Sequence, residues 1–179
     1  MLVLCAGSGC IGLAVASQTP GVRVVLGEYS DAALKICRQN IRRNGLSGRV
    51  VPIQADALEK PERTLGEFQC IISNPPYIPR GDIAGLDASV REYEPHLALD
   101  GGEDGLDFYR SIAQNYAKAL RPGGYLCFEY GAEQGDAVQA ILEMNGYTIL
   151  ERTRDYNDRD RAILARYGRK EDINGNEEE

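Results

Sequence analysis

The segment Asn74-Pro75-Pro76-Tyr77 follows the apolar run 70–72 and carries groups suited to holding an amino group. The prolines lack an N–H, so the loop presents acceptors and few donors, and their fixed φ keeps it rigid. Asn74 Oδ1 and the Pro75 carbonyl can accept both hydrogens of a substrate –NH2 group and stabilise positive charge that grows on its nitrogen. Tyr77 can lie flat against a planar amide or base. A Pro-rich strand exit with no chemical role is the simpler alternative.

Three other predicted strand ends carry residues typical of a nucleoside site. The stretch CAGSGCIG, from Cys5 to Gly12, follows a strand and opens a helix, so its backbone can approach a ligand. Glu28 ends the next strand and could accept hydrogen bonds from both hydroxyls of a ribose. Asp56 ends the third strand and could face an adenine amino group. Taken singly, these are a tight turn, a solvated carboxylate and a turn cap; together they predict a nucleoside-binding edge, which dinucleotide enzymes and methyltransferases share.

All of these motifs fall where predicted strands end. Strands are predicted over residues 2–4, 22–26, 49–54, 68–72, 125–129, 147–152 and 161–167, and helices over 11–16, 31–44, 106–120 and 134–144. Ser30 or Asp31 is expected to cap the second helix. The alternation predicts an α/β fold with a mostly parallel sheet, helices on both faces and an antiparallel hairpin at one edge. Ligands bind outside the carboxyl ends of the strands in such sheets.

The composition narrows the class of function. A net charge of −7 and a pI near 4.9 argue against a protein that grips a phosphate backbone. The arginines of the predicted second helix and third strand are interpreted as a solvated face: Arg38, Arg42, Arg43 and Arg49. Five scattered cysteines without a CxxC pair predict buried thiols, and no metal site is expected. Without a long apolar run or a basic signal start, we expect a cytoplasmic protein with no membrane partner.

The order of these motifs resembles class I S-adenosylmethionine-dependent methyltransferases that act on an amino or amide nitrogen. Residues 90–112, 120–138 and 154–166 closely resemble the protein-(glutamine-N5) methyltransferases of peptide chain release factors, the HemK/PrmC type. The resemblance extends to about residue 169, and Asn-Pro-Pro-Tyr alone is shared with DNA adenine methyltransferases. It implies a Rossmann-like catalytic domain over residues 1–169 with a seven-stranded sheet, and residues 170–179 are expected to form a disordered acidic tail.

The resemblance also implies roles for individual residues. S-adenosyl-L-methionine would be the cofactor, S-adenosyl-L-homocysteine its product, and a release factor the partner in translation termination, with no metal and no direct nucleic acid. Residues 74–77 would hold the glutamine of a Gly-Gly-Gln loop, with Asn74, Pro75 and Tyr77 catalytic and Pro76 contributing to substrate binding. Glu28, where the family usually has Asp, would hold the ribose. The implied cofactor-binding residues are Cys5, Ala6, Gly7, Ser8, Gly9, Glu28, Asp56, Ala57 and Asn74.

Several neighbouring residues have weaker expected roles. Glu92, Tyr93 and Glu94 could flank the substrate entrance, and a polar loop with one packed tyrosine is an equal alternative. Glu129 ends a strand at the same edge and is expected only to brace the site. The single histidine, His96, is interpreted as solvated or packing and not as catalytic.

Two departures from the family leave alternatives open. The family normally has a carboxylate in the first strand and a glycine at the first turn position, where this chain has Val3 and Cys5. Loss of a charge-assisted hydrogen bond there would weaken cofactor binding by about 1.5–3 kcal/mol. The family's N-terminal helical domain and hairpin are also expected to be absent. The alternatives are an N6-adenine or guanine-N2 nucleic-acid methyltransferase, disfavoured by the acidic pI, and a truncated, catalytically weak remnant.

Overall fold

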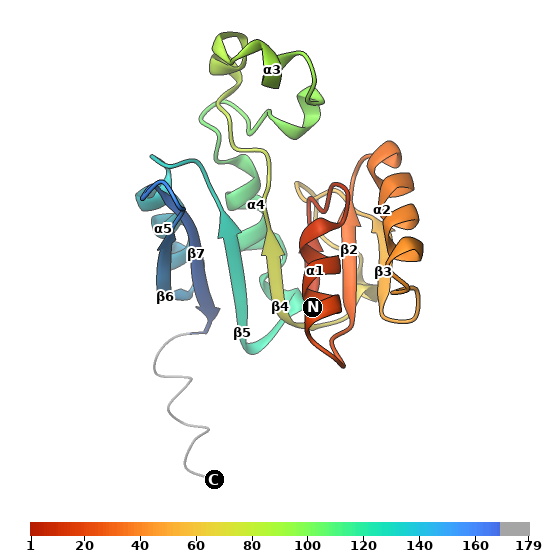
Figure 1. Ribbon diagram of the computed structural model, residues 1–179. Coiled ribbons are helices and arrows are strands. Elements are labelled where there is room, and N and C mark those ends of the chain that lie inside the picture. The colour runs from red at the N-terminus through yellow and green to blue at the C-terminus, as the bar shows by residue number, and fades with distance from the viewer. Residues whose placement is uncertain (169–179) are drawn as a thin grey trace.

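The computed structural model describes residues 1–168, which form one seven-stranded sheet with helices on both faces (Figure 1). The strands are β1 (Leu2–Leu4), β2 (Val24–Glu28), β3 (Val50–Gln54), β4 (Phe68–Ser73), β5 (Leu120–Glu129), β6 (Tyr147–Arg154) and β7 (Asp160–Tyr167). The helices are α1 (Cys10–Gln18), α2 (Asp31–Arg43), α3 (Ala88–Arg91), α4 (Asp107–Asn115) and α5 (Gly135–Met144). Four short 3-10 turns cover Arg63–Leu65, Arg80–Gly85, His96–Ala98 and Ala117–Ala119. Residues 169–179, including the predicted acidic tail, lie outside the described part.

The sheet order is β3-β2-β1-β4-β5-β7-β6. Strands β1 to β5 pair in parallel with one another, whereas β7 runs antiparallel to both β5 and β6. The predicted α/β class, the seven strands and the antiparallel edge hairpin are therefore confirmed. Because β1 lies between β2 and β4, the chain order reverses there, and this is the point where ligands bind in such sheets.

The side chains of β1 alternate between the two faces of the sheet, and the helices pack in pairs on these faces. Leu2 and Leu4 belong to the larger core cluster, which contains side chains of α4 and α5. Val3 points the other way, into a second cluster with side chains of α1 and α2. Since the strand is buried on both faces, it forms a continuous apolar run, as expected for the centre of a parallel sheet.

Local signals explain both ends of α2. Ser30 caps α2 by accepting a hydrogen bond from the Ala33 amide at 3.4 Å, which confirms the predicted cap. Asp31 lies in the first turn of α2 and Arg42 and Arg43 in the last, where each charge complements the helix dipole. This placement supports the interpretation of the two arginines as part of an exposed helix face.

The largest differences from the predicted boundaries are in β2, α4 and β5. Strand β2 runs from Val24 to Glu28 and not over 22–26, because its register with β1 continues to the pair Leu4–Gly27. Helix α4 ends at Asn115, five residues before its predicted end, and a 3-10 turn follows. Strand β5 starts at Leu120, so the predicted turn over 121–124 is instead part of the strand, where a register shift against β4 absorbs the irregularity.

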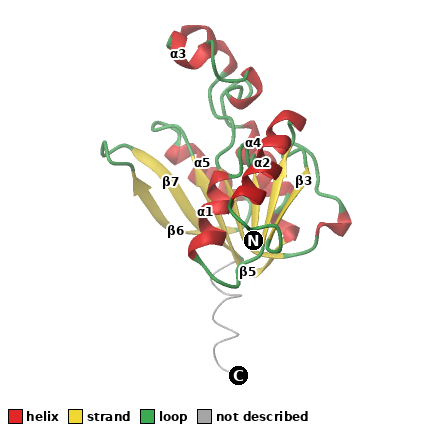
Figure 2. Ribbon diagram, turned by 45° about the vertical axis from the view of Figure 1, so that its right-hand side comes forward, coloured by secondary structure: helices red, strands yellow, loops and turns green. Residues whose placement is uncertain are grey.

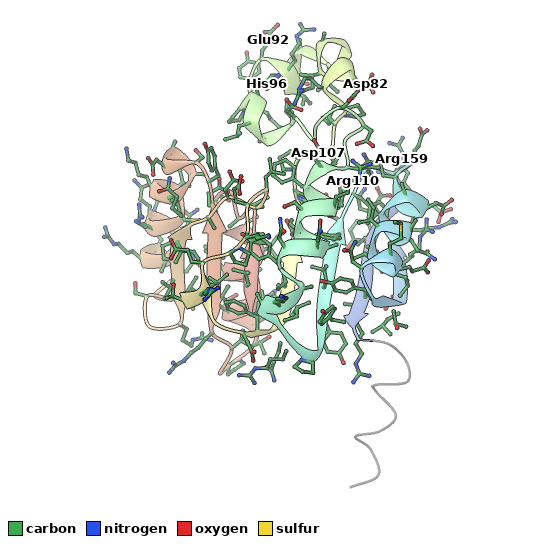
Figure 3. The ribbon with its side chains drawn as sticks, turned by 180° about the vertical axis from the view of Figure 1, so that it is seen from behind. Asp82, Glu92, His96, Asp107, Arg110 and Arg159 are labelled. Atoms are coloured by element: carbon green, nitrogen blue, oxygen red, sulfur yellow. The ribbon has the colours of Figure 1, made fainter. Side chains whose placement is uncertain are left out.

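A segment stands clear of the sheet at the carboxyl ends of the parallel strands (Figures 1 and 2). This projecting segment, residues 80–98, contains α3 and two of the 3-10 turns. Figure 3 shows Asp82, Glu92 and His96 on it, with Asp107 below them at the start of α4.

The base of the projecting segment is tied down by backbone hydrogen bonds. The Ile78 amide donates to the Leu99 carbonyl at 3.0 Å, and the Gly101 amide donates back to the Ile78 carbonyl at 2.9 Å. The Arg80 amide donates to the Gly102 carbonyl at 2.8 Å. The two ends of the projecting segment are thus held side by side, directly after residues 74–77. None of the helices formed by residues 1–168 has both the length and the apolar character needed to cross a bilayer.

Candidate active site

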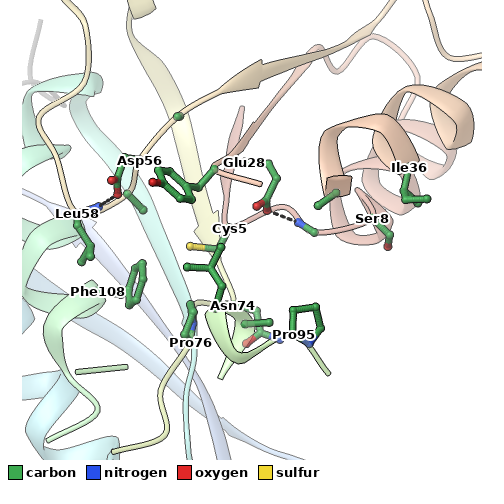
Figure 4. A pocket seen from close by; sticks show the side chains of 17 residues that line it. Cys5, Ser8, Glu28, Ile36, Asp56, Leu58, Asn74, Pro76, Pro95 and Phe108 are labelled. Carbon is green, nitrogen blue, oxygen red and sulfur yellow. Dashed lines mark hydrogen bonds between the residues drawn. The ribbon is translucent and has the colours of Figure 1, made fainter. Parts of the chain in front are cut away.

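A cavity of about 510 Å³ opens at the carboxyl ends of β1, β2, β3 and β4, at the reversal of strand order (Figure 4). Eight of the predicted site residues line it together: Cys5, Gly7, Ser8, Glu28, Asp56, Ala57, Asn74 and Pro76. Sequence positions separated by up to about 70 residues therefore meet in one cavity. The motifs predicted for a nucleoside and for an amino group share the same space.

The glycine turn needs its glycines for two different reasons. Gly7 has φ +55, and a Cβ placed on it would meet nothing within 4 Å, so its backbone faces open space. Gly9 has φ +84, and a Cβ there would lie 2.9 Å from Leu26 Cδ1 and 3.1 Å from Cys37 Sγ. Gly9 therefore lets the start of α1 pack closely on β2 and α2, while Gly7 leaves backbone exposed to a ligand.

Cys5 occupies the first turn position with φ +52, in the left-handed region that favours glycine. The strain of such a conformation in a non-glycine residue is about 1–2 kcal/mol. Burial raises the pKa of the Cys5 thiol to about 12, and the nearby carboxylates of Glu28 and Asp56 act in the same direction. The thiol is thus neutral near neutral pH and adds a small, weakly polar group to the cavity wall, where a glycine would leave only backbone.

Glu28 closes the glycine turn against β2. Its side chain is only 8% exposed, so the interpretation as a solvated strand end is wrong. Glu28 Oε2 accepts a hydrogen bond from the Gly7 amide at 2.7 Å (Figure 4). Its Oε1 accepts one from the Ser30 amide at 2.8 Å. Each carboxylate oxygen keeps a further lone pair, so the braced carboxylate can still accept from a ligand hydroxyl.

Asp56 is fixed by its own turn and by α4. Its Oδ1 accepts the Leu58 amide at 2.8 Å, and no donor within residues 1–168 bonds to its Oδ2. The Tyr116 hydroxyl donates to the Asp56 carbonyl at 3.1 Å, and the Ser111 hydroxyl donates to the Ala57 carbonyl at 2.8 Å. Helix α4 and the turn after it therefore hold the backbone after β3 and leave one carboxylate oxygen of Asp56 available to a ligand.

The loop after β4 presents its asparagine to the cavity. Asn74 is exposed and lines the cavity with Pro76, whereas Pro75 is buried and Tyr77 is half-buried. Just before the loop, the buried Ser73 hydroxyl donates to the Leu4 carbonyl at 3.0 Å and ties β4 to β1. Four predicted residues do not line the cavity: Ala6, Gly9, Pro75 and Tyr77.

The residues with weaker expected roles lie on or near the projecting segment. Glu92, Tyr93, Glu94 and His96 are all exposed, and none of them lines the cavity. Tyr93 is 83% exposed, so the alternative of a packed tyrosine is wrong. The Glu129 backbone carbonyl accepts a hydrogen bond from the buried Tyr109 hydroxyl at 3.0 Å, whereas its side chain is outside the cavity.

Sequence reasoning missed the apolar wall of the cavity. Five large apolar side chains from different elements line it. They are Tyr29 after β2, Ile36 in α2, Leu58 after β3, Leu97 in the projecting segment and Phe108 in α4. Four of these remain largely exposed at the rim, namely Tyr29, Ile36, Leu58 and Leu97. Apolar residues close after predicted strand ends, such as Tyr29 and Leu58, could have indicated part of this wall. That all five side chains meet at one cavity depends on the fold.

The cysteines are all free, and only part of the burial prediction is confirmed. Cys37 is buried, and its thiol donates to the Gly7 carbonyl at 3.2 Å; burial raises its pKa to about 11. Cys10, in contrast, is exposed at the start of α1, because that position of the helix faces away from the sheet. Across residues 1–168, no three His, Cys, Asp or Glu side chains are grouped so that they could hold a metal ion.

Comparison with known proteins gives relatives that agree with the predicted resemblance. The chain is 45% identical over 166 residues to a release factor glutamine methyltransferase of Moorella thermoacetica, covering 92% of this chain and 57% of that protein. It is 40% identical over 162 residues to the release factor glutamine methyltransferase of Clostridium acetobutylicum, covering 90% and 57%. The chain thus spans just over half the length of these curated relatives.

Solved structures share the fold at low sequence identity. A methyltransferase from Pyrococcus furiosus superposes with a TM-score of 0.68 at 16% identity, covering 93% of this chain and 74% of that one. A ribosomal protein L11 methylase from Lactobacillus delbrueckii subsp. bulgaricus gives 0.64 at 16% identity, covering 93% and 69%. These likenesses show the fold alone.

The match to a protein family covers the part of the chain that builds most of the cavity. Residues 1–90 match the methyltransferase small domain, and this half of the chain includes the glycine turn, Glu28, Asp56 and Asn74. The chain therefore belongs to the family of the methyltransferase small domain.

Proposed function

We propose that this protein is an S-adenosylmethionine-dependent methyltransferase that methylates the side-chain amide nitrogen of a glutamine, in the Gly-Gly-Gln loop of a peptide chain release factor. One observation carries the proposal: the cavity that is lined by Gly7, Glu28 and Asp56 is also lined by Asn74 and Pro76. A nucleoside-binding edge and an acceptor-rich loop in one space are what a methyl donor and a –NH2 acceptor require. The curated relatives named as release factor glutamine methyltransferases support the choice of substrate.

The cavity suits the cofactor in size and in chemistry. A volume of about 510 Å³ falls within the range of about 300–1,000 Å³ that is usual for small-molecule sites. The braced carboxylate of Glu28 is an acceptor for ribose hydroxyls, and the second oxygen of Asp56 is an acceptor for an amino group on a base. The open backbone of Gly7 leaves room for the amino-acid portion. Leu58 and Phe108 supply apolar surface for a planar ring.

The bound cofactor would supply a methyl group on a sulfonium centre, and the protein would supply position and charge acceptance. An amide nitrogen is a weak nucleophile because its lone pair is delocalised. Asn74 Oδ1 and the Pro75 carbonyl would accept the two amide hydrogens, orient the nitrogen and stabilise its positive charge during transfer. Positioning of this kind can contribute about 7–11 kcal/mol. Tyr77 would lie against the plane of the carboxamide.

The proposal needs neither a metal ion nor a dedicated base. Once methylated, the nitrogen is acidic, and its proton can leave to water at the open side of the cavity. The Cys5 thiol, although close, is neutral because its pKa is about 12, so it does not take this proton at neutral pH. A release factor substrate also implies the cytoplasm, where translation terminates.

The experiment has two steps. First, S-adenosylmethionine is titrated into the protein by calorimetry. Second, the protein and cofactor are incubated with a release factor, with a Gly-Gly-Gln peptide and with DNA and RNA, and each product is examined by mass spectrometry. We expect cofactor binding and a gain of one methyl group on the glutamine. Methylated nucleic acid would support an adenine or guanine methyltransferase instead, and the absence of binding heat would support a weak remnant.

A further inference from the structure

Gln134 lies outside the cavity, yet its side chain joins three loops at the carboxyl edge of the sheet. It comes just before α5, in the loop that follows β5. Its Nε2 donates to the Tyr77 carbonyl at 2.9 Å and to the Gly105 carbonyl at 3.2 Å. Its Oε1 accepts from the Gly131 amide at 3.0 Å. One neutral side chain thereby connects residues 74–77 with two loops from other parts of the chain.

The partners of this amide fix its orientation. Rotation of the carboxamide by half a turn would direct Oε1 at two carbonyl oxygens and Nε2 at an N–H group, so every contact would become repulsive. Both ends of Gln134 are half-buried, where an unpaired polar group costs more than in water. The side chain is therefore a directional clamp and not a general space filler.

The glycine loop 101–105 is shaped to allow this clamp. Gly105 has φ +76, and a Cβ there would lie 2.3 Å from the Tyr77 carbonyl oxygen and 2.7 Å from Gln134 Nε2. A Cβ on Gly101 would lie 2.7 Å from Tyr77 Cα and 2.9 Å from the Pro76 carbonyl oxygen. Both glycines leave room for the backbone of Pro76 and Tyr77 to lie directly against the loop.

The clamp supplies a second anchor for the peptide group at the end of the acceptor loop. The rings of Pro75 and Pro76 fix their φ angles, and Ser73 anchors the beginning of the loop to β1. Downstream, the Ile78 amide and carbonyl are paired with residues 99 and 101. The Tyr77 carbonyl belongs to the same peptide group as the Ile78 amide, so this group is held by Leu99 through its N–H and by Gln134 through its C=O. Its orientation decides where Tyr77 and the carbonyls before it point.

We propose that Gln134 is a positioning residue for methyl transfer, which holds the loop 74–77 in the geometry that receives the acceptor amide. The inference rests on the proposed function for its kinetic consequence, but the clamp itself is a property of the fold. Gln134 touches neither the cofactor space nor the acceptor, because it does not line the cavity. Its loss should therefore lower the rate of transfer and leave cofactor binding nearly unchanged.

Gln134→Glu is the most informative variant. A carboxylate has nearly the same shape and keeps the acceptor for the Gly131 amide, but it directs a negative oxygen at the Tyr77 and Gly105 carbonyls. We expect kcat near pH 7 to fall by about 10- to 100-fold, in line with the effect of a small misplacement, with the Kd for S-adenosylmethionine changed less than about twofold. Protonation of the new carboxyl restores a donor, so the loss should shrink as the pH falls toward about 5.

Gln134→Ala and Gln139→Ala complete the set. Gln134→Ala removes the clamp without adding charge, so its loss of kcat should not depend on pH. Gln139→Ala is the matched control in α5, because within residues 1–168 the Gln139 side chain bonds with Glu143 and Arg152 and with no group of the loop 74–77. The control should keep the wild-type kcat, Kd and pH profile. A Gln134→Glu variant with wild-type kcat, or one that loses cofactor affinity and melting temperature as much as rate, would overturn the inference.

Hydrogen exchange separates this inference from the proposed function. If the wild-type protein methylates no glutamine peptide, the proposed function fails, and the clamp is still tested by exchange of the Ile78 and Gly101 amides. Both amides are hydrogen-bonded beside the clamp. We expect them to exchange at least about tenfold faster in Gln134→Glu than in Gln139→Ala. Equal exchange in the two variants would overturn the inference.

Discussion

The two sides of the cavity are built in different ways. On the side of β1, β2 and β3, a strained Cys5 and a carboxylate that bonds two backbone amides hold the turn. On the side of β4, the loop 74–77 is held by prolines, by closely packed glycines and by neutral hydrogen bonds. At Val3 and Cys5 the first side departs from the pattern that the sequence resemblance implies, whereas the loop 74–77 matches that pattern. We infer that the first side governs cofactor affinity and that the second governs the rate of transfer.

Asn74→Ala should give the largest effect and should act mainly on the rate of transfer, with only a small effect on cofactor affinity. Removal of one group that stabilises developing charge costs about 10²–10³ in kcat. Because Asn74 is exposed and makes no hydrogen bond within residues 1–168, the fold should be unaffected. Single-turnover kinetics with a Gly-Gly-Gln peptide measure the loss, and calorimetry should show a cofactor Kd within about threefold of wild type.

Asn157→Ala, at another exposed loop asparagine, is the control. A loss of cofactor affinity as large as the loss of rate would contradict the division of roles between the two sides of the cavity.

Glu28→Gln should weaken cofactor binding and leave kcat at saturating cofactor close to wild type. The amide is isosteric, but its NH2 group must face either the Gly7 or the Ser30 amide, so one brace is lost together with the charge. A charge-assisted hydrogen bond is worth about 1.5–3 kcal/mol, which corresponds to about 10- to 100-fold in Kd. Calorimetric titration measures this change. Unchanged cofactor affinity would show that Glu28 does not contribute to cofactor binding.

Cys5→Gly should give the smallest effect, and in the opposite direction. Glycine adopts φ +52 without strain and removes a side chain from the cavity wall, so cofactor affinity should rise by about two- to tenfold. Cys5→Ala keeps the Cβ and the strain and loses only the sulfur. It should therefore bind cofactor like the wild type. If both variants gain equally, the thiol and not the backbone conformation limits binding.

Most of the fold could be predicted because the elements carry recognisable local patterns in the sequence. Buried β-branched runs alternate with amphipathic helices, and Ser30 and Asp31 mark the start of α2 as expected. The boundaries of β2 and β5 were wrong because they depend on register with neighbouring strands, which local patterns do not contain. Because β5 pairs with β4, it includes the Pro-Gly-Gly stretch at residues 122–124, a pattern that normally predicts a turn.

The site was predictable where its residues follow strand ends, and not where it depends on long-range contacts. Gly7, Glu28, Asp56 and Asn74 each end or follow a strand, so their convergence follows from the sheet itself. Leu97 reaches the cavity only because the end of the projecting segment returns to the carboxyl edge of the sheet beside the cavity. Gln134 acts on a carbonyl 57 residues earlier, and nothing in its own surroundings in the sequence indicates that contact.

The most direct test is a crystal structure of the protein with S-adenosylhomocysteine and a Gly-Gly-Gln peptide. The central claim requires one cavity to receive both molecules, with the glutamine amide held by Asn74. We expect the glutamine nitrogen at about 3 Å from both Asn74 Oδ1 and the Pro75 carbonyl oxygen, and facing the thioether sulfur. A structure with the cofactor product bound elsewhere, or with the loop 74–77 directed away from that sulfur, would contradict the account.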